Sequence, residues 1–244
     1  MLAKPVVCAM VPARLGSTRL KMKNLALIDG EPMVGYAINS AINSNVFDDV
    51  YLNSENDIFK SISDDYGAKF YKRKYKLGSS ITKSDEVIAD FISSHPEYDI
   101  VVWVNSISPF QTPEEIRNIV NYFIDNKLDS LITVSNHNVH CMYDNNPLNF
   151  NMSEVFAQTQ DLIPVQSFVY SVMMWRSKSF MQDYKNKGYG IFCGNFGTYP
   201  VGKLTEIIIK DQNDLMLADL LMRSIRKNQD KYEIKYDKSV ETIK

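Results

Sequence analysis

The order of apolar and amphipathic stretches along the first half of the chain is the feature that most constrains its fold. Residues 5–11, "PVVCAMV", and 48–54, "DDVYLNS", are typical of short strands. Between them, apolar residues recur at helical spacing over 33–42. The order strand, helix, strand predicts a βαβ unit, in which the two strands run parallel and the helix covers one face.

The alternation continues to about residue 135. A helix is expected from about Asn56 to Tyr66, and further strands are expected at 68–73, 98–106 and 129–135. This order predicts one mostly parallel sheet that is covered by helices and joined by right-handed crossovers.

The segment "TPEEIRNIVNYFIDNK" at 112–127 has the clearest signals of a helix start. Thr112 suits the N-cap, Pro113 suits the first helical position, and Glu115 is expected to return the capping bond. The boundary of this helix is therefore predicted at Thr112.

The second half of the chain is less regular. Residues 167–175 and 204–209 are expected to be strands that return to the sheet, and 211–227 to be a closing amphipathic helix. The periodicity fails over 137–164, which is too long for a tight turn and suits a lid or a small subdomain. No linker interrupts the sequence, so we expect a single domain.

Composition excludes several classes of function. The formal charge is 27 − 29 = −2, so nothing in the overall balance indicates nucleic acid or an anionic membrane as a partner. The three cysteines are widely spaced and the three histidines form no pair at metal-ligand spacing. No stretch approaches the ~20 apolar residues of a membrane span, and the chain begins without a signal-peptide pattern. We expect a cytoplasmic protein.

The loop "VPARLGSTRLKMKN" at 11–24 follows the first expected strand, and ligands of open α/β sheets bind at that edge. Gly16 lets backbone amides approach a phosphate and Ser17 adds a hydroxyl donor. The glycine spacing matches neither a Walker loop nor a dinucleotide fingerprint. The basic residues that can neutralise a polyphosphate are Arg14, Arg19, Lys21 and Lys23.

The spacing P-A-R-x-G-S, followed after five residues by K-N, resembles the N-terminal signature of acylneuraminate cytidylyltransferases, which join CMP to sialic acid and its relatives. The segments at 25–68 and 105–116, the latter "NSISPFQTPEEI", are also similar to that family. The "STRL" within the loop is similar to the related cytidylyltransferases for 3-deoxy-manno-octulosonate.

The resemblance implies a three-layer α/β fold, with a mostly parallel sheet of the nucleotide-diphospho-sugar transferase type and a small excursion subdomain. A single nucleotidyltransferase domain over 1–244 is expected, with a lid or dimerisation excursion at about 137–200. The resemblance also implies a homodimer, because the family usually forms one.

In such a family CTP lies over the loop, and the anomeric hydroxyl of the acid sugar attacks its α-phosphate with release of pyrophosphate. Arg14 and Lys23 match the catalytic positions, because negative charge develops on the bridging oxygen as the bond breaks. The nucleotide-binding residues that the resemblance implies are Ala13, Arg14, Gly16, Ser17, Lys23, Asn24, Asn105 and Ser108.

Six of these residues also have a structural alternative. Arg14 and Lys23 suit solvated surface charges. Gly16 and Ser17 suit a turn without a ligand, and Asn24 suits the cap of that turn. Ser108 precedes Pro109 and can simply shape the chain there.

The resemblance implies substrate contacts for Arg73, Gln158 and Gln160. Arg73 is equally suited to a structural salt bridge. Gln158 and Gln160, in "FAQTQDL", are equally suited to be exposed loop amides.

The sequence departs from the family at the magnesium site. The family holds Mg²⁺ with two late aspartates, and the aligned positions here are Ile208 and Lys210, which cannot ligate it. Asp211 is the remaining candidate ligand, and it also suits the N-cap of the last helix. Tyr170 and Ser171 replace an Asn-Gly pair of the family, which leaves the acid sugar open.

Two hypotheses follow. The first is an active cytidylyltransferase for a sialic-acid-like sugar or a 3-deoxy-manno-octulosonate-like sugar. The second is a catalytically degenerate homologue that binds nucleotide or sugar in a regulatory role. The missing carboxylates favour the second hypothesis. A pyrophosphate-release assay with CTP and acid sugars distinguishes the two experimentally.

Overall fold

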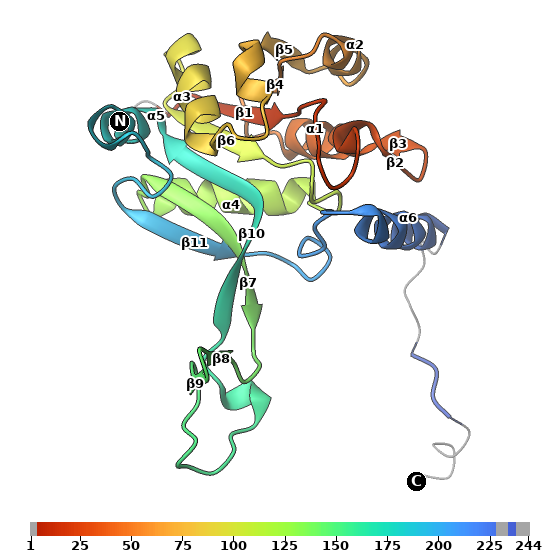
Figure 1. Ribbon diagram of the computed structural model, residues 1–244, viewed down its shortest axis with the longest axis vertical. Helices are drawn as coiled ribbons and strands as arrows, with labels where there is room; N and C mark the ends of the chain where they lie inside the picture. Colours follow the sequence, from red (N-terminus) through yellow and green to blue (C-terminus); the bar gives the residue numbers. More distant parts are fainter. Residues whose placement is uncertain (1–3, 228–233, 238–244) are drawn as a thin grey trace.

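The computed structural model describes residues 4–227 and 234–237, which form a central sheet and its helical covers (Figure 1). The seven strands of the sheet are β1 (Val7–Pro12), β4 (Asp49–Ser54), β5 (Lys69–Lys72), β6 (Ile100–Val104), β7 (Ser130–His137), β10 (Val165–Arg176) and β11 (Phe196–Pro200). Their order is β11-β7-β10-β6-β1-β4-β5. Only β10 runs antiparallel to its neighbours in this sheet, so the predicted mostly parallel sheet is confirmed.

Helices cover both faces of the sheet, which gives the expected three layers (Figure 1). One core cluster is closed by α1 (Met33–Ser44), α2 (Ile58–Asp65) and α4 (Pro113–Asp125), and the opposite cluster by α3 (Ser84–Ser94) and α5 (Ser177–Lys187). Alternate residues of β6 enter the two clusters, as a strand buried on both faces requires. The βαβ order read from the sequence is therefore confirmed.

The start of α4 shows one confirmed prediction and one that is wrong. Thr112 Oγ1 accepts a hydrogen bond from the amide of Glu115 at 3.1 Å, as expected of the N-cap. The Glu115 carboxylate does not return the bond to Thr112. It accepts from the amide of Gly202 at 2.6 Å and from Thr205 Oγ1 at 2.7 Å. Glu115 therefore ties α4 to the chain that follows β11.

The strand expected at 204–209 is wrong, because the last strand of the sheet is β11, which pairs with β7 in parallel. Residues 204–209 form a turn and an extended stretch in which the amide of Ile209 donates to the carbonyl of Ile107 at 2.8 Å. Ile207 and Ile209 pack in a small third cluster below α6 (Gln212–Lys227). The apolar run is thus buried by a helix rather than by a strand ladder.

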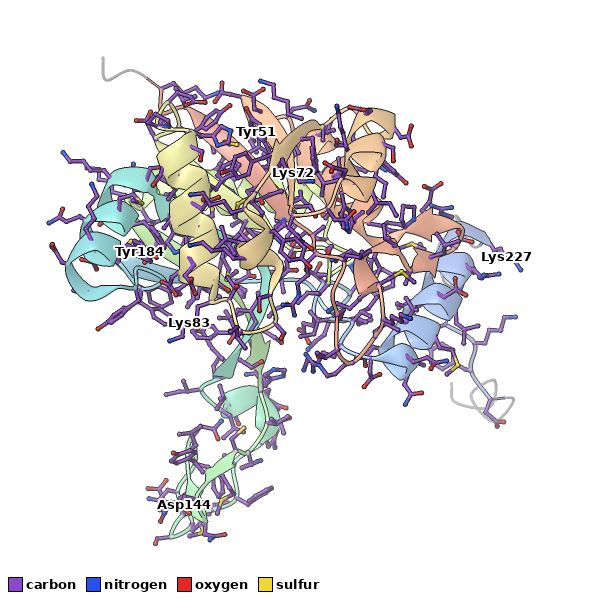
Figure 2. All side chains as sticks on the ribbon, turned by 45° about the horizontal axis from the view of Figure 1, so that its top comes forward. Tyr51, Lys72, Lys83, Asp144, Tyr184 and Lys227 are labelled. Atoms are coloured by element: carbon purple, nitrogen blue, oxygen red, sulfur yellow. The ribbon has the colours of Figure 1, made fainter. Side chains whose placement is uncertain are left out.

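A two-stranded ribbon, formed by the ends of β7 and β10, projects from the body (Figure 1). Beyond it lies a small hairpin of β8 (Met142–Tyr143) and β9 (Asn146–Pro147), and Figure 2 shows Asp144 at the far end. The projection ends at β10, earlier than the expected range 137–200, because α5 and β11 pack in the body.

The ribbon leaves the sheet at an irregularity in β10. The pairing of β10 with β7 shifts register between Phe168 and Met173, and Tyr170 has a φ of 59°. A bulky side chain rarely adopts such a backbone, whereas the Asn-Gly pair of the resemblance would do so at lower cost. The shift places the carbonyl of Ser171 where it accepts from the amide of Asn105 at 2.8 Å. The departure in sequence therefore coincides with local backbone strain beside the end of β6.

Cys8, Cys141 and Cys193 form no disulfide. Within residues 4–227 and 234–237, no helix combines the length and the apolar character needed to cross a bilayer.

Candidate active site

A cavity of about 280 Å³ lies beside the carboxyl ends of β1 and β6, the edge at which open α/β sheets bind ligands. Six of the predicted site residues line it together: Ala13, Arg14, Lys23, Asn24, Arg73 and Asn105. The remaining lining residues are Pro12, Leu77, Ser79, Ser80, Thr82, Ser84, Val87, Trp103, Ser106 and Ile107.

The loop after β1 is held in place by its own polar side chains. The amide of Ala13 donates to the carbonyl of Asn53 at 2.9 Å, which fixes the start of the loop on β4. Asn24, in the short helix η1 (Lys23–Leu25), donates from Nδ2 to the carbonyl of Arg14 at 3.0 Å. Its Oδ1 accepts from Ser106 Oγ at 2.7 Å. Asn24 therefore joins the two ends of the loop by a hydrogen bond and links the loop to the residues that follow β6.

Two cations of this loop reach the cavity. Arg14 donates from Nη1 to the carbonyl of Ser79 at 3.0 Å, and Lys23 donates from Nζ to the carbonyl of Ile209 at 3.1 Å. Burial lowers the pKa of Lys23 below its ordinary value, and the nearby charges of Arg19 and Arg14 lower it further. The loop thus carries mutually repelling cations, and a bound polyanion would relieve that repulsion.

Arg73 forms a buried ion pair with Glu55. Its Nη2 lies 2.7 Å from Glu55 Oε2, and the two side chains are only 4% and 6% exposed. Arg73 also donates to the carbonyl of Ala13 at 2.8 Å, while Glu55 Oε1 accepts from the amide of Leu15 at 3.0 Å. Burial lowers the pKa of Arg73, and Glu55 opposes that shift. The ion pair thus holds the start of the loop at Ala13 and Leu15, and Arg73 also lines the cavity.

No aspartate or glutamate of the described chain lines the cavity. Asp211 is exposed, and its Oδ1 accepts from the amides of Asn213 at 2.9 Å and Asp214 at 3.2 Å. Asp214 Oδ2 accepts in turn from the amides of Lys210 at 2.7 Å and Asp211 at 3.2 Å. Both carboxylates cap the start of α6, and the described residues contain no group of three or more candidate metal ligands.

Besides Asp211, five predicted residues lie outside this cavity. Gly16 and Ser17 line a neighbouring hollow of about 700 Å³, which shares Ser79 with the cavity. Ser108 is buried and donates to the carbonyl of Thr205 at 2.7 Å, which suits its structural alternative.

Gln158 and Gln160 lie at the short helix η3 (Thr159–Asp161) in the projection, and they hydrogen bond to each other. Both are exposed, and neither lines the cavity of the same chain.

Sequence reasoning missed three contributors to the site. Glu55 comes directly after β4, and its position at the ligand-binding edge of the sheet could have identified it from the sequence. Ser79 and Ser80 follow η2 (Tyr75–Gly78), where no motif marks them. Trp103 looked like part of an apolar strand, although it is the second-last residue of β6 and lines the cavity.

Comparison with solved structures identifies the class of this fold. A CMP-2-keto-3-deoxy-manno-octonic acid synthetase in complex with CTP superposes with a TM-score of 0.66 at 15% identity, covering 90% of this chain and 99% of that one. A 4-diphosphocytidyl-2C-methyl-D-erythritol synthase from Anaerococcus prevotii gives the same TM-score at 14% identity, covering 90% and 96%. The fold is that of nucleotidyltransferases.

Comparison of sequences identifies the family. The sequence profile described as cytidylyltransferase matches residues 8–189, and the chain belongs to that family. An N-acylneuraminate cytidylyltransferase of Escherichia coli is 24% identical over 243 residues, covering 93% of this chain and 54% of that protein. Another, form A of Danio rerio, is 28% identical over 128 residues, covering 52% of this chain and 30% of that protein.

A pseudaminic acid cytidylyltransferase of Campylobacter jejuni is 30% identical over 122 residues, covering 48% of this chain and 53% of that protein. This chain thus spans from about a third to just over half of the length of these relatives.

Proposed function

We propose that this protein transfers CMP from CTP to the anomeric hydroxyl of a sialic-acid-like acid sugar, with release of pyrophosphate. The observation that carries the proposal is the braced loop after β1, which brings Arg14 and Lys23 to one cavity at the ligand-binding edge of the sheet. The family match covers this loop, and relatives of the chain are named for such acid sugars.

In the proposed reaction the oxygen of the anomeric hydroxyl forms a bond to the α-phosphorus and its proton passes to solvent, while the bond from that phosphorus to the pyrophosphate oxygen breaks. Negative charge grows on the departing pyrophosphate, so cations held near it lower the barrier. Arg14 and Lys23 fill this role. Asn24 and the Arg73–Glu55 pair hold the loop that carries these cations, so little reorganisation is needed when the nucleotide binds.

Magnesium, which the family resemblance implies, does not fit the residues around this cavity. Mg²⁺ takes oxygen ligands, commonly one or two carboxylates beside substrate phosphates. The cavity lining has no carboxylate among the described residues, and Asp211 and Asp214 are engaged by backbone amides. Arg14, Lys23 and Arg73 are the charges available to the triphosphate, and Asp211 as a ligand stays a prediction.

The same deficit favours a second candidate function, a catalytically degenerate homologue that binds nucleotide or sugar in a regulatory role. A transferase for a 3-deoxy-manno-octulosonate-like sugar is a variant of the first proposal.

We also propose a homodimer in the cytoplasm. The exposed apolar side chains of the projection, such as Val155 at 94% and Phe156 at 75%, are consistent with coverage by a second copy.

The test is a pyrophosphate-release assay with CTP and a panel of N-acetylneuraminate, pseudaminate and 3-deoxy-manno-octulosonate, each with and without added magnesium. The proposal predicts release with at least one sugar, dependent on both substrates. Binding of CTP in calorimetry without release from any acid sugar would favour the degenerate homologue. Release with UTP or ATP in preference to CTP would contradict the proposed nucleotide.

A further inference from the structure

Two residues of the cavity lining each carry a buried hydrogen-bond donor without a partner. Among the described residues, Trp103 Nε1 and Arg73 Nε are shielded from solvent and donate to no protein atom. A buried donor without an acceptor destabilises a folded chain, and such groups are uncommon in proteins. Both residues line the cavity, so a ligand bound there can supply acceptors for them.

The other tryptophan shows what this chain does with an indole that serves only packing. Trp175 is fully buried against Phe180, and its Nε1 donates to the carbonyl of Ile191 at 2.9 Å. A buried indole normally finds such a partner. Trp103 is half-buried, lines the cavity and has an indole N–H without a protein partner, so the two tryptophans differ in whether the N–H is paired.

The chemistry of the lining separates the parts of a nucleotide. The cations Arg14 and Lys23 come from the loop after β1, and they suit the triphosphate. The large apolar side chains come from other elements: Leu77 from η2, Val87 from α3 and Trp103 from β6. A planar base has apolar faces and polar edges, so its place is against these apolar side chains, where the indole N–H can reach an edge atom.

We propose that Trp103 is a specificity-determining residue for the nucleotide, and that its indole N–H donates a hydrogen bond to a ring acceptor of the pyrimidine base. The acceptor is a carbonyl oxygen or an unprotonated ring nitrogen. This inference rests on the proposed function, since it assumes that the cavity takes CTP. It adds a base contact that the cationic loop cannot provide.

Tryptophan fluorescence tests the proposal directly, because the sequence contains only these two tryptophans. Titration of the native protein with CTP or CMP should change the emission, whereas inorganic tripolyphosphate should bind without changing it. In Trp103→Phe, which keeps an aromatic ring but lacks the N–H, only Trp175 emits and the CTP-dependent change should vanish. Calorimetry on that variant should show CTP affinity reduced by about threefold to tenfold, with tripolyphosphate affinity unchanged.

The outcomes separate this inference from the proposed function. Calorimetric binding of CTP to the native protein with no change in emission, or with equal affinity in Trp103→Phe, would overturn the role of Trp103 alone. An equal emission change with tripolyphosphate would also overturn it, since phosphate has no reason to approach the indole. Absence of CTP binding to the native protein would overturn both proposals. The native titrations need no variant, so they decide even if Trp103→Phe fails to fold.

Discussion

Replacing Glu55 by alanine should be among the most destabilising single changes near the site. The substitution removes a carboxylate that is 2.7 Å from Arg73 and 3.0 Å from the amide of Leu15. Arg73 is only 4% exposed, so water cannot replace the lost partner, although the carbonyls of Ala13 and Asn53 remain within reach. Breaking a buried ion pair by removing one partner typically costs about 3–5 kcal/mol.

The assay is urea denaturation at neutral pH, followed by circular dichroism, with the unfolding slope checked against the native protein. A matched control is Asp57→Ala, because Asp57 pairs with Lys72 on the surface and is 78% exposed, so its loss should cost under about 1 kcal/mol. Glu55→Gln keeps an acceptor without the charge, and its cost should fall between the two. A loss of unfolding free energy for Glu55→Ala no larger than that for Asp57→Ala would show that the buried ion pair does not stabilise the fold.

Four other predictions concern the loop, the helix cap and the assembly. Arg14→Ala should weaken CTP binding by roughly 1.5–3 kcal/mol in calorimetry, the loss of one charge-assisted contact, and unchanged affinity would remove Arg14 from the site. Lys23→Met should weaken CTP binding to a similar extent without lowering the free energy of unfolding. Burial lowers the pKa of Lys23, so its charge opposes folding at neutral pH, and this cost fades as pH rises through the lowered pKa. Asp211→Asn should keep turnover within a few fold, since asparagine caps helices about as well as aspartate, whereas a fall by orders of magnitude would make Asp211 a metal ligand. Sedimentation should give a dimer at micromolar concentration, and a 28.0 kDa species would contradict it.

The layers of the fold follow from local signals, and the sequence predicts them well. The strands β4, β5 and β6 lie within the predicted ranges, and β1 and β7 end one and two residues beyond theirs, because short stretches rich in β-branched and aromatic residues mark these strands. Thr112 marks a helix start through chemistry contained in four residues. Such features do not depend on distant parts of the chain.

The two wrong predictions, the strand at 204–209 and the capping role of Glu115, concern residues whose contacts are made with distant parts of the chain. The run at 204–209 has strand-like composition, yet α6 and the carbonyl of Ile107 hold it outside the sheet. Glu115 suits a capping box, but the chain after β11 offers it an amide and a hydroxyl. Ile107, Gly202 and Thr205 are distant in sequence from the residues that they contact, so periodicity and motif spacing cannot reveal these contacts.

The site divides in the same way. Arg14, Lys23 and Asn24 belong to one contiguous motif, so the sequence predicts that they act together, and they line one cavity. For Arg73 the sequence left a ligand contact and a salt bridge equally open, because its partner, Glu55, is 18 residues away. Trp103 could not be separated from a core residue, because only the structure shows which tryptophan has a partner for its N–H.

A crystal structure of the protein soaked with CTP and magnesium would show whether the loop after β1 holds the triphosphate of CTP in the cavity beside β6. We expect phosphate oxygens within hydrogen-bond distance of Arg14 and Lys23, with the base against Trp103 and no protein carboxylate at the phosphates. A triphosphate bound away from Arg14 and Lys23 would contradict the proposed role of the loop.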